Sequence, residues 1–491
     1  MTSIAAEHTS TGGEPGPARN LIGGEWLTSA TTGVSVSPAD GRVLGTYYEA
    51  DEAQVREAIE VARETFATHA WRTDRQLRAR VLNEMADRVE AATDELAGML
   101  ARENGKILPE AHFELSLTPS KLRYYAAQAL TGSGSGDRAR PGVYSILLSE
   151  PVGVVGVIVP WNSPVVLSVR SFAPALAAGC TVVMKMAAQT ALVNTRLAEL
   201  LADCPSLPAG VLSVFNESGS AGAKLLVSSP DVAALSYTGS TDVGRRIMAD
   251  AAPTLKRLSL ELGGKTPMIV FEDADLDAAV GTIVAGITTF TGQFCMTGSR
   301  VLVQESVADE VRSRLAEALG RVRVGPGDAE GSQMGPLIDQ ASRDRLENLI
   351  AESLGDAEVI VPGGRPEEGE LSAGAYYRPA LFGVRDTDSP LVQKELFGPV
   401  ATFETFGTEE EAVRRANATQ YGLAASVWTA DGARGLRMAD ALDAGTVWTN
   451  GWAVVLDQFE EGGYKQSGLG RLNGNRALEE FQEYKHIVQV V

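Results

Sequence analysis

The stretch over residues 152–240 most constrains the fold, because apolar strands and helices alternate along it. Residues 152–159 are apolar without alternation, as expected of a strand that is buried on both faces. Residues 160–164 end this strand, and the helix that follows runs to Ala178, where Gly179 stops it. Strand, helix and strand at this spacing form a parallel crossover unit.

The same unit repeats along the chain, after a helical pattern over residues 51–102. Ser163 is the expected N-cap of the first crossover helix. The following strands and helices are expected at residues 181–185, 191–201, 211–215, 221–227 and 232–236 and from Ser240. A second series is expected at residues 267–271, 276–289, 300–303 and 307–318. The sequence therefore predicts an α/β protein with two doubly wound α/β domains.

Composition limits the partners of the chain. Among its 491 residues, 43 are Lys or Arg and 63 are Asp or Glu, which gives a formal net charge of −20. This charge argues against nucleic acid and against an anionic membrane surface as partners. The longest apolar run, residues 152–161, is about half of the roughly 20 residues that a membrane-spanning helix needs. The first 20 residues contain no apolar core and are expected to be a disordered tail without a secretory signal.

Cysteine and histidine spacing point away from disulfides and metals. The three cysteines lie far apart and form no C-x-x-C pair, which predicts a reducing cytoplasm and no disulfide framework. The four histidines show no metal-ligand spacing, so we expect no metal site and no His-based triad.

One cysteine lies where a nucleophile could act. Cys295 is in residues 291–299, where Gly292 and Gly298 indicate irregular backbone between a helix and a strand. An exposed thiol on such a loop can attack a carbonyl carbon. The alternative is a small buried hydrophobic side chain, which is our interpretation of Cys180 and Cys204. For Cys295, the spacing alone leaves both interpretations open.

Two further polar residues follow predicted strands. Glu261 precedes a Gly pair and could deprotonate a water molecule beside a thioester, or could be an exposed strand acid. Asn162 lies just past the first buried strand, at the edge where open α/β sheets bind ligands. Its amide could donate to a developing oxyanion, or could serve only as a turn residue.

A phosphate-binding turn is expected near the same sheet edge. Residues 238–244 open a helix after a strand, so their backbone N–H groups and the Ser240 hydroxyl could bind a pyrophosphate. Lys185 ends the neighbouring strand and could hold ribose hydroxyls or a phosphate. No G-x-G-x-x-G pattern follows a strand, and the glycines of residues 468–474 have the wrong spacing and context.

Together these motifs form a resemblance that covers nearly the whole chain, from about Leu21 to Val491. The order and intervals of the motifs resemble those of the aldehyde dehydrogenase superfamily, in its hydrolytic, non-CoA-acylating type. The motifs are residues 160–164, Lys185, and residues 238–244, 260–265, 292–295, 395–399 and 462–468.

The resemblance implies oxidation of an aldehyde to a carboxylic acid with NAD or NADP, an activity of class EC 1.2.1. It implies that Cys295 is the nucleophile, that Asn162 and the Cys295 N–H form an oxyanion hole, and that Glu261 activates the water that hydrolyses the thioester. The implied cofactor-binding residues are Trp161, Lys185, Gly239, Ser240, Leu262, Glu395 and Phe397. The alternatives are a CoA-acylating semialdehyde dehydrogenase of the same fold, which Glu261 disfavours, and a non-catalytic scaffold.

The resemblance also implies a domain plan. A cofactor-binding domain would take residues 21–132 and 153–261, and a catalytic domain residues 262–460. Residues 133–152 and 475–491 would form a small β arm for oligomerisation, which implies a homodimer or homotetramer. Pairing of the C-terminal strand with residues 143–148 of another subunit is one expected arrangement.

Four departures from many relatives, at five positions, affect this interpretation. Ala188 replaces a Glu that would repel a 2′-phosphate, so we expect NADP to be usable. Ser171 and Leu472 replace a Lys and a Glu that can relay a proton from the deacylation base. Glu460 and Glu461 replace a Pro-Phe pair beside the substrate tunnel.

Two substrate classes stay open. Arg170 matches an Arg with which succinate-semialdehyde members bind a carboxylate, although a second such Arg is Thr289 here. The alternative for Arg170 is a pair with a surface or interface acid. Phe294 and Trp452, with Phe290 and Val166, could instead line an apolar tunnel for aromatic aldehydes.

Overall fold

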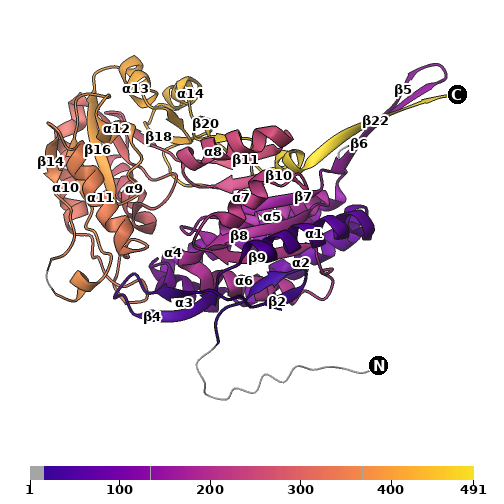
Figure 1. Cartoon of the computed structure of the whole chain (residues 1–491). Helices are drawn as coiled ribbons and strands as arrows, with labels where there is room; N and C mark the ends of the chain where they lie inside the picture. Colours follow the sequence, from indigo (N-terminus) through magenta and orange to yellow (C-terminus); the bar gives the residue numbers. More distant parts are fainter. Residues whose placement is uncertain (1–15, 133, 368) are drawn as a thin grey trace.

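The structure is a computed structural model that describes residues 16–132, 134–367 and 369–491. Two α/β bodies face each other, and a narrow arm of strands projects from one of them (Figure 1). This architecture confirms the prediction of two doubly wound α/β domains. Among the described residues, none of the helices has both the length and the apolar character needed to cross a membrane.

The first domain is built on a sheet of eight strands in the order β2-β1-β9-β8-β7-β10-β11-β21. The five central strands are parallel, and β1, β2 and β21 add antiparallel edges. β7 is buried at every position, as its unbroken apolar sequence predicts. The bounds are β1 Asn20–Ile22, β2 Glu25–Leu27, β7 Val154–Ile158, β8 Thr181–Ala187, β9 Leu212–Glu217, β10 Val232–Thr238, β11 Arg257–Glu261 and β21 Gly468–Leu469.

Helices cover both faces of this sheet (Figure 1). The helix α4 was not predicted; it contains Pro119 and packs against α2 and α5. Gly179 ends α5 in the left-handed conformation, as predicted. The bounds are α1 Glu52–Thr68, α2 Arg75–Ala91, α3 Thr93–Glu103, α4 Leu108–Leu130, α5 Pro164–Ala178, α6 Ala191–Ala202, α7 Ala221–Ser228 and α8 Thr241–Ala251.

The second domain has a sheet of seven strands in the order β14-β15-β16-β13-β12-β18-β19. All of its strands are parallel except the edge strand β14. The strands are β12 Pro267–Val270, β13 Arg300–Gln304, β14 Glu358–Val361, β15 Ala380–Gly383, β16 Val400–Phe406, β18 Ala424–Trp428 and β19 Thr446–Thr449. The helices are α9 Leu276–Thr288, α10 Ala308–Gly320, α11 Gln340–Ser353, α12 Pro390–Gln393, α13 Glu409–Ala416 and α14 Gly432–Ala441. Two short pairs, β3 Thr32–Val36 with β4 Val43–Tyr48 and β17 Tyr421–Gly422 with β20 Tyr464–Lys465, lie outside the main sheets.

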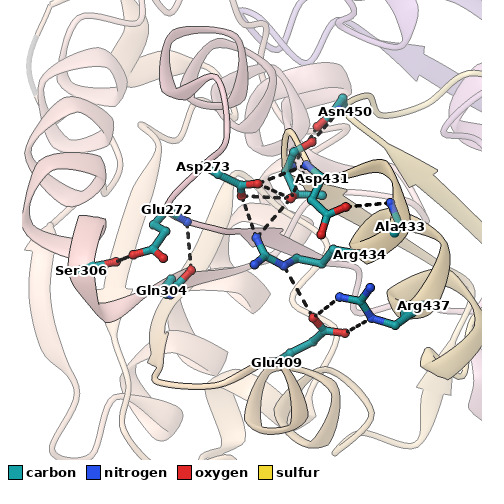
Figure 2. A network of polar contacts seen from close by, with 11 residues as sticks. Glu272, Asp273, Gln304, Ser306, Glu409, Asp431, Ala433, Arg434, Arg437 and Asn450 are labelled. Carbon is teal, nitrogen blue, oxygen red and sulfur yellow. Dashed lines mark hydrogen bonds and ion pairs between the residues drawn. The ribbon is translucent and has the colours of Figure 1, made fainter.

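A polar network joins helices and strand ends of the second domain (Figure 2). Arg434 on α14 donates to the Asp273 carboxylate at 2.8 Å, just past the end of β12. Arg437, on the same helix, donates to Glu409 at the start of α13 at 2.9 Å. None of the residues labelled in Figure 2 lines the cavity described below.

The arm consists of β5 Ser135–Arg140, β6 Val143–Pro151 and β22 Gln482–Val490. β22 pairs with β6 of the same chain, with Ile487 opposite Ile146. The predicted pairing across subunits is therefore wrong. The short 3₁₀ helix η7, Arg476–Phe481, packs on α5, and the Phe481 carbonyl accepts from Val152 N at 3.1 Å, which brings the C-terminal strand alongside its own β6.

The predicted N-terminal tail over residues 1–20 falls mostly outside the described residues. Its last part differs from the prediction, because Ala18 already bridges to Tyr47 and β1 starts at Asn20. Residues 461–474, which had no domain assignment, add β21 to the edge of the first sheet next to β11.

Candidate active site

A single cavity of about 620 Å³ is lined by residues of both domains. The three predicted catalytic residues, Cys295, Glu261 and Asn162, all line it. Six predicted cofactor residues line it as well: Trp161, Gly239, Ser240, Leu262, Glu395 and Phe397. Cys295 is thus not sealed in an apolar interior, and the residues that the sequence singled out separately share one space.

The loop before Cys295 has an unusual backbone. Phe290 and Thr291 have φ values of 52° and 56°, which side chains other than glycine rarely adopt, and Gly292 follows at 68°. A Cβ atom on Gly292 would lie 2.1 Å from the Gly398 carbonyl oxygen, so only glycine fits there. Glu110 on α4 holds the loop by accepting from Phe290 N at 2.8 Å. Such strain persists only where the surroundings enforce it, and it is typical of functional sites.

Cys295 is half-buried, between the exposed thiol and the buried hydrophobic side chain that the spacing left open. It packs in one cluster with Phe294, Met296 and Trp452. Burial raises the pKa of the Cys295 thiol to about 12, and the nearby positive charge of Arg170 opposes that rise. A thiol with this pKa carries its proton at neutral pH, so attack by the sulfur would require a base in the same cavity.

Asn162 lies in the turn between β7 and α5 and contacts the loop that carries Cys295. Its Nδ2 donates to the Gln293 carbonyl at 3.0 Å, which leaves the second N–H of the amide for another acceptor. The predicted capping of α5 by Ser163 is wrong, since Ser163 makes no side-chain cap and its hydroxyl instead contacts Lys106 at 3.0 Å. The cap is the Glu114 carboxylate, which accepts from Val165 N at 2.9 Å and also pairs with Lys106.

Glu261 is the last residue of β11 and is 4% exposed, so it is not an exposed strand acid. Burial raises its pKa to about 8, while Arg170 favours the ionised form. Among the described residues, no group donates a hydrogen bond to its Oε1 atom. A carboxylate with this pKa and a free oxygen is suited to accept a proton near neutral pH.

The residues expected to bind a dinucleotide fit that role. Ser240 caps α8 by accepting from Val243 N at 3.4 Å, so the first turn of this helix faces the cavity with a hydroxyl and N–H groups. A Cβ atom on Gly239 would lie 2.2 Å from the Tyr237 hydroxyl, so the turn must keep a bare backbone there. These features match what a pyrophosphate requires.

The residues predicted to bind the nicotinamide side of the cofactor also make defined contacts. Glu395 accepts from Gly264 N at 3.0 Å, and burial raises its pKa to about 7. The rings of Trp161 and Phe397 meet edge to face at 5.6 Å between centroids. Lys185 does not line the cavity; it lies at the end of β8 near Glu217, and burial lowers its pKa.

The predicted substrate residues lie behind the cavity rather than on its walls. Phe294 meets Phe290 and Trp452 edge to face at 5.4 and 5.8 Å, and Trp452 donates to the Met296 carbonyl at 2.8 Å. Arg170 is buried and contacts Glu461 at 3.4 Å, so its partner is an interior acid and not the surface or interface acid that was the alternative.

Several supporting residues were not found from the sequence. Glu110 and Glu114 come from α4, whose helical pattern was not identified, and they hold the Cys295 loop and the start of α5. Glu461 could have been found from the sequence, because many relatives carry an uncharged residue at this position. The buried Lys106 had no signal beyond its own charge.

The fold and the cavity define a class of protein: a two-domain α/β protein with a thiol and a carboxyl group in one cavity at the carboxyl edge of a doubly wound sheet. The sequence pattern of the aldehyde dehydrogenase family matches residues 26–487. The chain is 38% identical over 483 residues to phenylacetaldehyde dehydrogenase of Pseudomonas fluorescens, with 96% of each chain covered. It is 35% identical over 472 residues to betaine aldehyde dehydrogenase of Bacillus subtilis, covering 95% of this chain and 96% of that one.

A crystal structure of betaine aldehyde dehydrogenase from Staphylococcus aureus in complex with NAD+ superposes with a TM-score of 0.94 at 34% identity. The alignment covers 96% of this chain and 94% of that one. The chain therefore belongs to the aldehyde dehydrogenase family. The predicted family, enzyme class EC 1.2.1 and NAD or NADP as cofactor are confirmed.

Proposed function

We propose that this enzyme oxidises an aldehyde to the free carboxylic acid through a thiohemiacetal and a thioester on Cys295. The observation that carries the proposal is the shared cavity, which joins Cys295, Asn162 and Glu261 to the Ser240 turn. The cofactor, when bound, accepts the hydride of the aldehyde. Residues of the chain supply the nucleophile, the oxyanion donors and the base for the other steps.

In the acylation half, the Cys295 sulfur attacks the aldehyde carbon while its proton passes to a base, for which Glu261 is available in the same cavity. The carbonyl oxygen becomes an oxyanion, and the free N–H of Asn162 together with the Cys295 N–H would stabilise it. One such donor contributes roughly 3–4 kcal/mol in hydrolases.

Before deacylation, Glu261 releases the thiol proton to solvent. In the deacylation half, the oxygen of a water molecule then adds to the thioester carbon and Glu261 accepts the water proton. The C–S bond then breaks, the acid leaves, and the sulfur regains a proton. Since Glu261 can accept a proton from water, we propose the hydrolytic route and not transfer to CoA. The test is aldehyde-dependent NAD(P)H formation with release of free acid in the absence of CoA. Cys295→Ala should abolish both, and product formation that requires CoA would refute the hydrolytic route.

For the substrate, we propose an aromatic or otherwise apolar aldehyde over a carboxylated one. The aromatic rings of Phe290, Phe294 and Trp452 meet edge to face, and Phe294 and Trp452 pack in one cluster with the Cys295 thiol. Arg170, the candidate ligand for a substrate carboxylate, already has an anionic partner in Glu461. Phenylacetaldehyde and succinate-semialdehyde dehydrogenases are both among the relatives, so relatedness alone does not choose between the classes.

The substrate proposal predicts a ratio of specificities. We expect kcat/KM for phenylacetaldehyde and benzaldehyde to exceed that for succinate semialdehyde by about tenfold or more, since carboxylate binding would have to displace a buried partner of Arg170. The measurement is a set of initial rates with each aldehyde and NAD+. A higher kcat/KM for succinate semialdehyde would assign Arg170 to the substrate carboxylate.

We also propose that the enzyme is a homo-oligomer, a dimer or a tetramer, assembled through the arm. Tyr144, Ile146 and Leu148 alternate along β6 with their side chains exposed, next to Ile487 of β22. Exposed apolar side chains on a protruding sheet are typical of a surface that a second subunit covers.

A further inference from the structure

Arg170 on α5 is the buried cation beside the catalytic base. Its Nη2 donates to the Thr238 hydroxyl at 3.1 Å, and Thr238 is the direct neighbour of Glu261 across the β10–β11 pair. Its Nη1 contacts the Glu461 carboxylate at 3.4 Å. Arg170 therefore lies between two carboxylates, the catalytic one and a second one that the mechanism has not used.

Two buried polar atoms of this cluster have no hydrogen-bond partner among the described residues. One is Nε of Arg170, a donor, and the other is Oε1 of Glu261, an acceptor. Unpaired buried polar atoms are rare and usually mark a functional site or a water position. One atom is a donor and the other an acceptor, so a water molecule within reach of both could hydrogen-bond to each of them.

Glu461 is fixed by further polar contacts. Asn473 donates to the Glu461 carboxylate at 3.0 Å and accepts from the Lys121 ammonium at 2.8 Å. Lys121 pairs with Asp457 at 2.6 Å. The backbone N–H of Glu461 also donates to the Leu472 carbonyl at 2.7 Å. A carboxylate held this firmly can keep the Arg170 guanidinium in one orientation.

The charges that face Glu261 come from several elements. Arg170 and Arg471 favour its ionised form, whereas Glu461 and Glu480 oppose it, and the Cys295 thiol lies in the same cluster. The side chains at Ser171 and Leu472 are buried and carry no charge. Arg170 and Glu461 are therefore the two charged groups with the largest influence on the base.

We propose that Arg170 and Glu461 form a positioning pair for Glu261 and set the pH range in which the thioester is hydrolysed. The inference rests on the proposed function of Glu261 as the base that deprotonates the attacking water. Arg170 orients and stabilises the Glu261 carboxylate, and Glu461 holds Arg170 and limits that stabilisation. Neither residue touches the reacting atoms.

The test uses p-nitrophenyl acetate and the full-length enzyme without cofactor. The Cys295 sulfur attacks the ester, p-nitrophenolate leaves, and an acetyl thioester forms; water then releases acetate. The initial burst reports acylation, and the slower steady rate reports hydrolysis of the thioester. Both are measured as a function of pH.

The variants Glu461→Gln and Arg170→Gln are expected to shift the pH profile of the steady rate in opposite directions. Glu461→Gln removes a like charge beside Glu261, so the midpoint should move to lower pH by about one unit. Arg170→Gln removes the favourable cation, so the midpoint should move to higher pH by a similar amount. The double variant should lie between the two. A purely structural role would not produce opposite shifts.

The matched control is Glu409→Gln, which removes a carboxylate from the ion pairs of Figure 2, apart from the cavity. Its pH profile should equal that of the unmodified enzyme. A thermal melt of each variant shows that it is folded, and if Arg170→Gln does not fold, the isosteric Glu461→Gln decides alone. A Glu461→Gln midpoint that does not move overturns the inference. Failure of the proposed function is a separate result, namely no aldehyde-dependent NAD(P)H from the unmodified enzyme.

Discussion

Among single residues, Cys295 and Glu261 have both been moved out of their usual titration ranges by burial. The thiol pKa rises to about 12 and the carboxyl pKa to about 8. These two shifts suit one reaction, because a base that titrates near 8 is a far better proton acceptor than an ordinary carboxylate. The sequence identified both residues, but their pKa values depend on neighbours from other elements, above all Arg170.

The raised pKa of Glu261 predicts the pH dependence of turnover. Glu261 accepts protons only in its ionised form, so kcat should rise as the pH increases through about 8 and fall below it. The measurement is kcat under saturating aldehyde and cofactor across this range. Glu261→Gln should lose about 100-fold or more in kcat, with the acyl enzyme visible by intact mass. A flat profile together with an unaffected variant would remove Glu261 from the mechanism.

Ala188 carries a prediction about the cofactor. It follows the last residue of β8, close to Lys185, and offers no carboxylate that would repel a 2′-phosphate. We therefore expect kcat/KM with NADP+ within about 100-fold of that with NAD+, and Ala188→Glu should lower the NADP+ value selectively. Initial rates with the two cofactors test this. Turnover with NADP+ below a hundredth of that with NAD+ in the unmodified enzyme would contradict the prediction.

Among the elements, the loop between α9 and β13 carries Cys295, the proposed nucleophile. It bends through consecutive positive φ values at Phe290, Thr291 and Gly292, and α4 restrains it through Glu110. Gly292 and Gly298 predicted an irregular backbone here, but not its conformation. That conformation depends on contacts with Gly398 and Gly335, which lie far along the chain.

Two glycine-to-alanine variants test whether the backbone of this loop is constrained. Gly292→Ala should destabilise the protein by about 1–3 kcal/mol and strongly reduce activity, since its Cβ would clash with the Gly398 carbonyl in a left-handed backbone. The control is Gly281→Ala in α9, where a Cβ meets nothing within 4 Å and a helical Ala is favoured. Thermal or urea unfolding and initial rates measure both variants. Equal behaviour of the two would show that the loop backbone is not constrained.

On the scale of the whole molecule, two sheets face one cavity and an arm extends away from both (Figure 1). Most of the predicted cofactor residues in the cavity come from the carboxyl end of the first sheet, where parallel sheets bind ligands. It takes Cys295 and Glu395 from the second domain. Among the described residues, none of the arm strands lines the cavity.

The arm predicts the behaviour of the enzyme in solution. Replacing Ile146 and Ile487, which are paired across β6 and β22, by Lys should lower the molar mass measured by light scattering after size-exclusion chromatography. The control is Leu255→Lys, since Leu255 is 91% exposed but lies outside the arm. An unchanged mass for the double variant would show that the subunits do not associate through this face.

The sequence by itself determined the central buried strands, the crossover helices and the position of the irregular loop that carries Cys295, because apolar runs and glycine positions act locally. Residues 152–159 and Gly179 did not need the rest of the chain to specify a buried strand and a helix end. The tertiary structure alone decided that Glu114 and not Ser163 caps α5, that β22 pairs within its own chain, and that Arg170 meets Glu461. The physical reason is distance along the sequence: these contacts join residues tens to hundreds of positions apart, and whether a charge is buried or paired depends on which distant elements the fold brings against it.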